Sequence, residues 1–97
     1  MTLEDLHEAF DAQDGEYLKF DRIESPRHPC PDVCAFLMLY DLVPIKDDMV
    51  SAAAHDTIFL ATDLEALAAK VTPDDIRDLT RCGVMLDKSL DCLFMFA

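Results

Sequence analysis

Cysteine and histidine side chains gather in one short stretch, "HPCPDVCAF", where thiol or metal chemistry could take place. His28, Cys30 and Cys34 lie close together in the sequence, and imidazole and thiolate are both good zinc ligands. Cys30 also stands at the expected start of a helix, where free N–H groups and the helix dipole favour a thiolate. Cys82 or Cys92 could complete a set of four ligands.

The spacing of these cysteines differs from that of common zinc sites. The first pair follows Cys-x3-Cys rather than Cys-x2-Cys, and Cys82 and Cys92 are ten residues apart. Cys34 and Cys92 also lie within apolar runs, where free cysteine behaves as a small hydrophobic side chain. We therefore interpret the cysteines as buried structural thiols and predict no metal and no cofactor. The alternative is a zinc- or thiol-dependent protein that uses Cys30, His28 and Cys34.

The pair His55-Asp56 is the other arrangement that could do chemistry. Adjacent side chains diverge and seldom act as a base and its orienting group, and no serine or cysteine lies in a recognisable nucleophile motif. Gly15 and Gly83 are the only glycines, so the chain has no glycine-rich loop for phosphates. The strings "KDD", "PDD" and "TDLE" lack the spacing of a calcium loop. The sequence predicts that the protein is not an enzyme, and no catalytic residue is assigned.

Charge and length limit the classes of partner. The 97 residues are enough for a single domain, residues 1–97, and they carry 20 acidic against 8 basic side chains, a net charge of −12. Such a surface repels nucleic-acid phosphates and anionic lipids, because few basic groups can neutralise them. We expect a protein partner, which could be a second copy in a homo-oligomer, and no direct contact with nucleic acid or membrane.

The N-terminus and the longest apolar run favour a cytoplasmic protein. "MTLEDLHEAF" lacks the positive region of a signal peptide. The run at residues 33–40 is much shorter than the roughly 20 residues of a membrane span. In a reducing compartment structural disulfides are rare, so the four cysteines are read as thiols.

Residues 1–23 predict a helix followed by a strand. Thr2 can cap a helix that runs to about Gln13, with apolar residues at helical spacing, and "DG" ends it. "EYLKFDRI", residues 16–23, alternates in the manner of a half-exposed strand.

A strongly apolar helix is predicted next. Pro31 suits the first helical position, and Asp32 favours the positive end of the helix dipole. Nearly every residue from Val33 to Leu42 is apolar, so this helix should be buried on most sides and form the centre of the fold. A strand is the alternative for so short an apolar run, and Pro44 ends the segment in either case.

The second half of the chain predicts a connection, a strand and a short helix. Residues 45–56 read as a connection with one helical turn at most, and "TIFLA" at 57–61 reads as a short buried strand. Thr62 would cap the helix "DLEALAAKV", with Glu65 completing a capping box.

The last elements are a helix and two strands. Thr72 caps the helix, Pro73 is its first residue, and Asp75 takes the third position. Gly83 supplies the left-handed residue that ends it. Residues 84–97 read as two strands joined by a turn near residues 87–89.

These elements predict an α+β fold. The order α-β-α-β-α-α-β-β suits a two-layer sandwich of about four strands, with the helices packed on one face of the sheet.

Three blocks of the sequence carry a resemblance. "PDVCAFLMLYDLVP", "SAAAHDTIFLATDLEALA" and "IRDLTRCGVMLDKSLDCLFMFA" resemble blocks found in small uncharacterised proteins of bacteria and their phages, over residues 17–97. The resemblance implies a free-standing small protein of phage or prophage origin. It implies no activity, cofactor or site residue.

Two classes of function follow from the sequence. The first is a small acidic protein that acts by protein–protein interaction, as a homo-oligomer or as a modulator of a larger protein. A variant of it is an acidic inhibitor that imitates nucleic acid, which would need its carboxylates spaced along one face. The second class is the zinc- or thiol-dependent protein described above.

Overall fold

Threonine capping boxes begin two of the helices, as the sequence predicts. In the computed structural model, which describes residues 1–96, Thr2 Oγ1 accepts a hydrogen bond from the N–H of Asp5, whose carboxylate accepts one from the N–H of Thr2. Thr72 and Asp75 form the same reciprocal pair. Such pairs satisfy N–H groups that the first helical turn cannot satisfy by itself. The four helices are α1 (Leu3–Ala12), α2 (Pro31–Leu42), α3 (Leu64–Lys70) and α4 (Pro73–Arg81).

The caps of the other two helices are less regular. Cys30 precedes α2 and makes no side-chain capping bond. The predicted cap of α3, Thr62, is one residue too early: Asp63 is the N-cap, and its carboxylate accepts a hydrogen bond from the N–H of Glu65. Both residues are good caps by type, so the sequence pattern alone does not separate them.

Residues 16–23, predicted as a strand, form no strand. They contain parts of two short 3₁₀ helices, Asp14–Glu16 and Phe20–Arg22. Leu18, between them, has a φ of 60° and donates a backbone hydrogen bond to Thr80 at the end of α4. Phe20 and Ile23, three residues apart, are the side chains that pack against the core, and that spacing suits a 3₁₀ turn.

The fourth strand of the sheet lies instead within residues 45–56, the segment that was predicted as a connection. β1 (Val50–Ala54) pairs antiparallel with β2 (Thr57–Leu60), and His55 at the turn has a φ of 53°. Alanine has a low strand propensity, so "VSAAA" gives little sign of a strand. Its conformation is decided by pairing with the more apolar β2 across a short turn.

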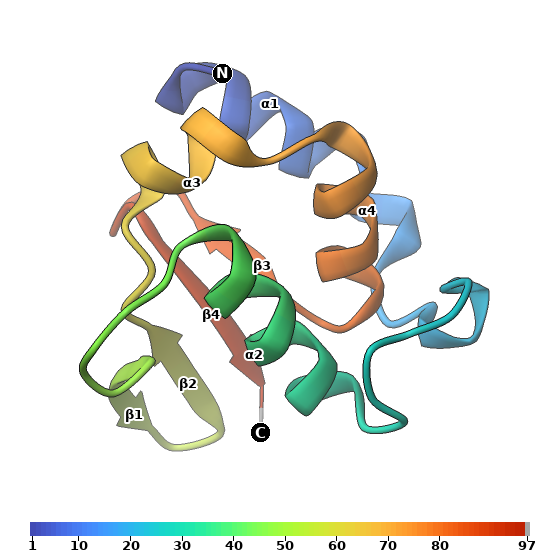
Figure 1. Ribbon diagram of the computed structural model, residues 1–97. Helices are drawn as coiled ribbons and strands as arrows, with labels where there is room; N and C mark the ends of the chain where they lie inside the picture. Colours follow the sequence, from blue (N-terminus) through green and yellow to red (C-terminus); the bar gives the residue numbers. More distant parts are fainter. Residues whose placement is uncertain (97) are drawn as a thin grey trace.

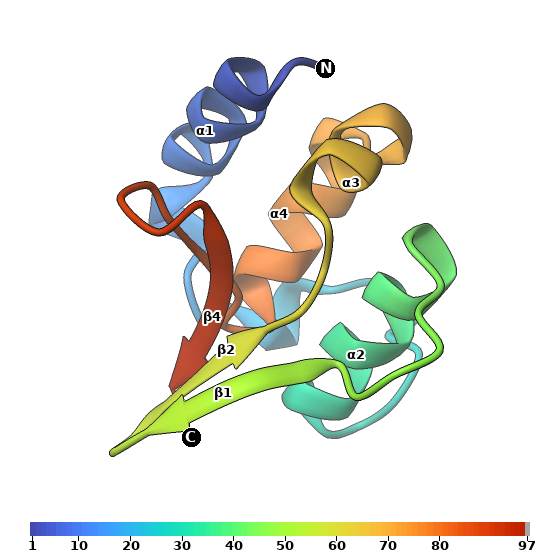
Figure 2. The ribbon, with the colours of Figure 1, turned by 90° about the vertical axis from the view of Figure 1, so that its left-hand side faces the viewer.

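Two further strands complete the sheet, as the sequence predicts. β3 (Met85–Asp87) and β4 (Cys92–Phe96) form a hairpin, and the strand order is β1-β2-β4-β3, with all neighbours antiparallel. The α+β class with four helices and a four-stranded sheet is therefore confirmed. Helices α2, α3 and α4 lie on one side of the sheet in Figure 2, and α1 contacts α3, α4 and β3 (Figures 1 and 2).

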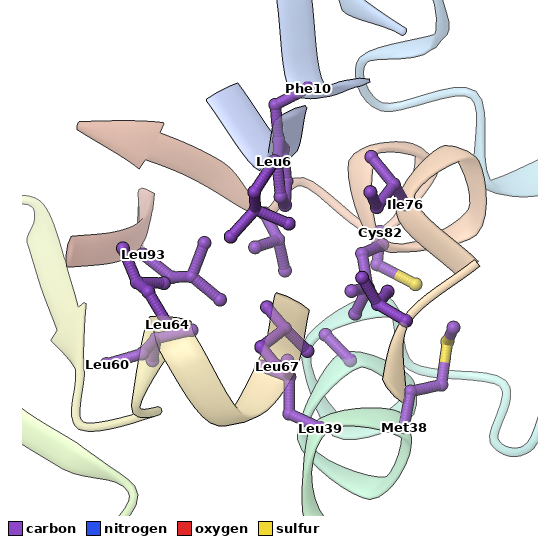
Figure 3. Close-up of a cluster of buried hydrophobic side chains, with 14 of the residues drawn as sticks. Leu6, Phe10, Met38, Leu39, Leu60, Leu64, Leu67, Ile76, Cys82 and Leu93 are labelled. Carbon is purple, nitrogen blue, oxygen red and sulfur yellow. The ribbon is translucent and has the colours of Figure 1, made fainter. Parts of the chain in front are cut away.

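The core fills the space between the helices and this face of the sheet. Side chains of alternating residues in the two central strands point into it, namely Leu60, Leu93 and Met95. Apolar residues of all four helices meet them there (Figure 3). The fully buried large ones are Leu6, Leu39, Leu67, Ile76 and Leu79. Burial of each is worth about 1.5–3 kcal/mol.

Candidate interaction surface

Helix α2 is apolar around its whole circumference, but the core covers only one side of it. Val33, Leu37 and Tyr40 remain 36%, 42% and 48% exposed. They recur at i, i+4 and i+7, so they share one face of the helix. The buried residues of α2 lie on the opposite side: Cys34, Ala35, Met38 and Leu39. The prediction of a central helix buried on most sides is therefore wrong, because α2 lies at the periphery.

Phe36 lies beside these exposed residues on the helix, and we call the four side chains Val33, Phe36, Leu37 and Tyr40 the α2 face. Phe36 also lines an apolar groove of about 390 Å³ between the start of α2 and the ends of β2 and β4. Its lining residues are Leu18, Pro31, Asp32, Phe36, Ile58, Cys82, Met95 and Phe96. Leu18 and Phe96 are 60% and 58% exposed. Phe36 thus belongs to both the α2 face and the groove, which lie next to each other.

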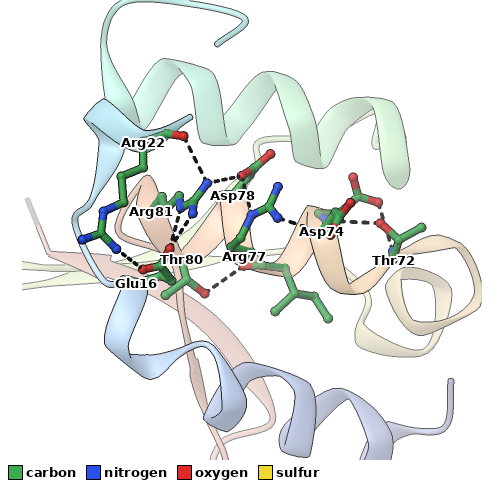
Figure 4. A network of polar contacts seen from close by, with 10 residues as sticks. Glu16, Arg22, Thr72, Asp74, Arg77, Asp78, Thr80 and Arg81 are labelled. Carbon is green, nitrogen blue, oxygen red and sulfur yellow. Dashed lines mark hydrogen bonds and ion pairs between the residues drawn. The ribbon is translucent and has the colours of Figure 1, made fainter. Parts of the chain in front are cut away.

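An ion-pair network holds Leu18 in its place at this groove. Glu16 accepts hydrogen bonds from Arg81 Nε (3.0 Å) and from Arg22 Nη1 (2.7 Å). Arg81 Nη1 also donates to the backbone oxygen of Arg22 at 3.2 Å (Figure 4). These contacts attach the 3₁₀ segment on both sides of Leu18 to the C-terminal turn of α4. The guanidinium of Arg81, and then that of Arg22, holds the pKa of the Glu16 carboxyl below its usual value.

Charged side chains lie at the ends of the α2 face and not within it. Asp32 is the only charged residue among those lining the groove, and its carboxylate accepts a hydrogen bond from the N–H of Val33 at 3.1 Å. Near the C-terminal end, Asp41 forms an ion pair with Arg27. The centre of the surface therefore carries no charge, although the chain has a net charge of −12.

The candidate metal ligands occupy different environments. His28 Nδ1 accepts a hydrogen bond from the N–H of Cys30 at 3.0 Å, and Cys30 is exposed. Cys34, one turn further along α2, is buried. Within residues 1–96, no group of three or more His, Cys, Asp or Glu side chains is arranged to hold a metal ion.

The remaining thiols lie in the core or next to the sheet. Burial raises the pKa of the Cys82 thiol, and the neighbouring Cys34 thiol raises it further. Burial also raises the pKa of Cys92, whose Sγ lies 3.3 Å from the backbone oxygen of Leu60. Cys30 is therefore the thiol that solvent reaches most easily.

The pair His55-Asp56 forms the turn between β1 and β2, at the end of the segment that was predicted as a connection. Both residues are exposed, and the turn directs Asp56 into β2. The structure places this pair on the hairpin turn and not with His28 or Cys30.

Sequence reasoning did not identify the exposed side of α2, although a signal was present. A helix that is apolar all round is normally buried all round, and α2 carries only Asp32 and Asp41 as charged residues. A single domain of this size has one sheet face and few other helices, so little surface is available to cover every side of α2. The size of the domain thus indicated that some apolar surface would stay open, but not which side of α2. The contribution of Leu18 to the groove gave no signal, because it depends on the 3₁₀ segment where a strand was predicted.

Comparison with known proteins gives no match to a family model, to a curated protein sequence or to a solved structure.

None of the helices within residues 1–96 is long and apolar enough to cross a membrane.

Proposed function

We propose that the protein is a non-enzymatic interaction protein, which binds another protein through the α2 face and the adjacent groove. The observation that carries the proposal is the exposure of Val33, Leu37 and Tyr40 on a helix whose other side is already anchored in the core.

The energetics of exposure support this use of the surface. Contiguous apolar patches on small proteins commonly mark sites of interaction. Full burial of an exposed large side chain is worth about 1.5–3 kcal/mol, and Val33, Leu37 and Tyr40, which are 36–48% exposed, can each contribute up to about half of that. Tyr40 adds an aromatic ring with a polar end, the residue type that often dominates the binding energy of an interface. Because the protein carries a net charge of −12, a protein partner is favoured over nucleic acid or an anionic membrane.

Two variants test the proposal. Leu37→Asp places a carboxylate at the centre of the α2 face. Leu90→Asp is the matched control, since Leu90 is 60% exposed and lies in the turn between β3 and β4. Both residues are exposed, so circular dichroism and melting temperature should resemble those of the wild type.

Affinity capture from the native host should then compare the three proteins. We expect binding partners, including untagged copies of the chain itself, to be retained by the wild type and by Leu90→Asp, and lost with Leu37→Asp. If Leu37→Asp retains every partner of the wild type, the α2 face is not the binding surface.

A further inference from the structure

The size of the exposed apolar surface is close to that needed by a small dimer. Its most exposed side chains are Leu18, Val33, Leu37, Tyr40 and Phe96. At about 150 Å² per side chain, the lower end of the range for aromatic residues, their exposed fractions of 36–60% amount to roughly 370 Å² per copy. The smallest stable interfaces bury about 600 Å² per partner, of which about 65% is apolar in homodimers. The exposed apolar area of one copy is therefore close to the apolar area that each partner buries in such an interface.

The α2 face is also complementary to itself. If two α2 helices cross antiparallel about a two-fold axis between Phe36 and Leu37, the small Val33 of one copy faces the large Tyr40 of the other. Phe36 then faces Leu37, and the helix dipoles oppose each other favourably. An interface of this kind uses the same patch on both copies and therefore closes as a dimer.

The ends of the helix fit this arrangement. Antiparallel packing brings Asp32 of one copy near the C-terminal end of α2 of the other, where Arg27 is paired with Asp41. Arg27 supplies a cation at the position where two carboxylates would otherwise meet. Exposed pairs contribute little to affinity, but this one prevents a like-charge contact.

We propose that the partner of the α2 face is a second copy of this chain, bound in a two-fold dimer with the two α2 helices antiparallel. This inference rests on the proposed function, because it names the partner of the same surface. The dimer buries uncharged side chains at its centre and keeps the acidic surface of both copies in solvent.

The charge of the chain gives the dimer a characteristic response to salt. Two copies, each with a net charge of −12, repel each other over about 30 Å at 0.01 M salt but over only about 8 Å at physiological ionic strength. Added salt should therefore strengthen the dimer. A complex with a basic partner would respond in the opposite direction, because salt screens attraction as well as repulsion.

Sedimentation equilibrium of the full chain tests the proposal, at protein concentrations from micromolar to millimolar and at about 0.02 M and about 0.5 M salt. We expect a dimer whose dissociation constant falls as salt is added. Leu37→Asp should be a folded monomer throughout, because it brings two carboxylates together near the axis, and Leu90→Asp should dimerise like the wild type.

Cross-linking tests the symmetry of the contact. In a Cys30→Ser background, Leu37→Cys should be joined rapidly to its copy by a short bismaleimide, because residue 37 lies next to the axis in both copies. Leu90→Cys in the same background should cross-link no faster than random collision allows.

The outcomes separate this inference from the proposed function. A wild type that is monomeric under all conditions overturns the dimer; if its captured partners still require Leu37, the proposed function stands with a different partner. A dimer that persists in Leu37→Asp, weakens with salt, or gives no cross-link at residue 37 also overturns the inference.

Discussion

At the scale of single residues, environment separates four cysteines that look alike in the sequence. Cys34 and Cys82 are buried together between α2 and α4, Cys92 is partly covered by the sheet, and Cys30 is exposed before α2. The thiolate is the reactive form, so a raised pKa slows Cys82 and Cys92, and burial denies reagents access to Cys34 and Cys82.

The rates of thiol modification should follow this order. Cys30 should react fastest with a disulfide reagent in the folded protein, Cys92 more slowly, and Cys34 and Cys82 only as fast as the protein unfolds. Mass spectrometry of time points would assign each site, and Cys30→Ser should remove the fast phase. Equal rates in native buffer and in denaturant would contradict the burial of Cys34.

Glu16 is the residue whose ionisation should matter for stability. Its pKa is lowered in the folded state by Arg81 and Arg22, so the charged form stabilises the fold above the unfolded pKa of about 4.3. That contribution is lost as the pH falls through the lower, folded pKa.

Replacement of Glu16 should make this dependence visible. Glu16→Gln should lower the melting temperature at neutral pH and make its decline below about pH 4.3 shallower than in the wild type. Glu8→Gln, an exposed position of α1 outside the network, is the control, and equal slopes in wild type and Glu16→Gln would exclude this role for the ion pairs.

At the scale of elements, local signals placed the helices well and the strands less well. The capping boxes at Thr2 and Thr72 and the stop at Gly83, with a φ of 102°, are formed as predicted. These features depend on residues within one helical turn of each other. Each strand depends on a pairing partner outside its own segment, and one of the four was predicted at the wrong segment.

The start of α3 offers a direct test of local capping. Asp63→Ala should reduce the free energy of unfolding by about 1 kcal/mol, because the N–H of Glu65 loses its acceptor. Thr62→Ala should change it by less than about 0.5 kcal/mol. Urea denaturation would measure both, and a larger cost at Thr62 would restore the cap that the sequence favoured.

At the scale of the whole molecule, β4 joins the two hairpins into one sheet. It pairs with β2 on one side and with β3 on the other, and its Leu93 and Met95 lie in the core. Small domains are stable by only about 5–15 kcal/mol, so the loss of this strand cannot be tolerated.

Deletion of residues 93–97 should therefore unfold the protein. Each large buried side chain is worth about 1.5–3 kcal/mol, and the deletion also leaves β2 and β3 without their common partner. Circular dichroism should show no cooperative melting transition. Phe96→Asp, at the exposed end of the same strand, should keep the fold, and a truncated protein with an unchanged melting temperature would contradict the central position of β4.

The amino-acid pattern alone predicts the α+β class, the four helices, the C-terminal hairpin and the burial of Cys34. These follow from periodicity, caps and apolar content, which act over a few residues. The packing of the elements was needed to show that 16–23 is not a strand, that β1 is one, and that α2 has an open side. The conformation of 16–23 depends on Arg81, more than fifty residues away, and that of β1 depends on its pairing with β2.

The α2 face is open because the core covers one side of α2 and no other element of residues 1–96 packs against Val33, Leu37 and Tyr40 closely enough to bury them. Which side of an apolar helix is covered depends on how all the elements pack together, and that arrangement cannot be read from the helix alone.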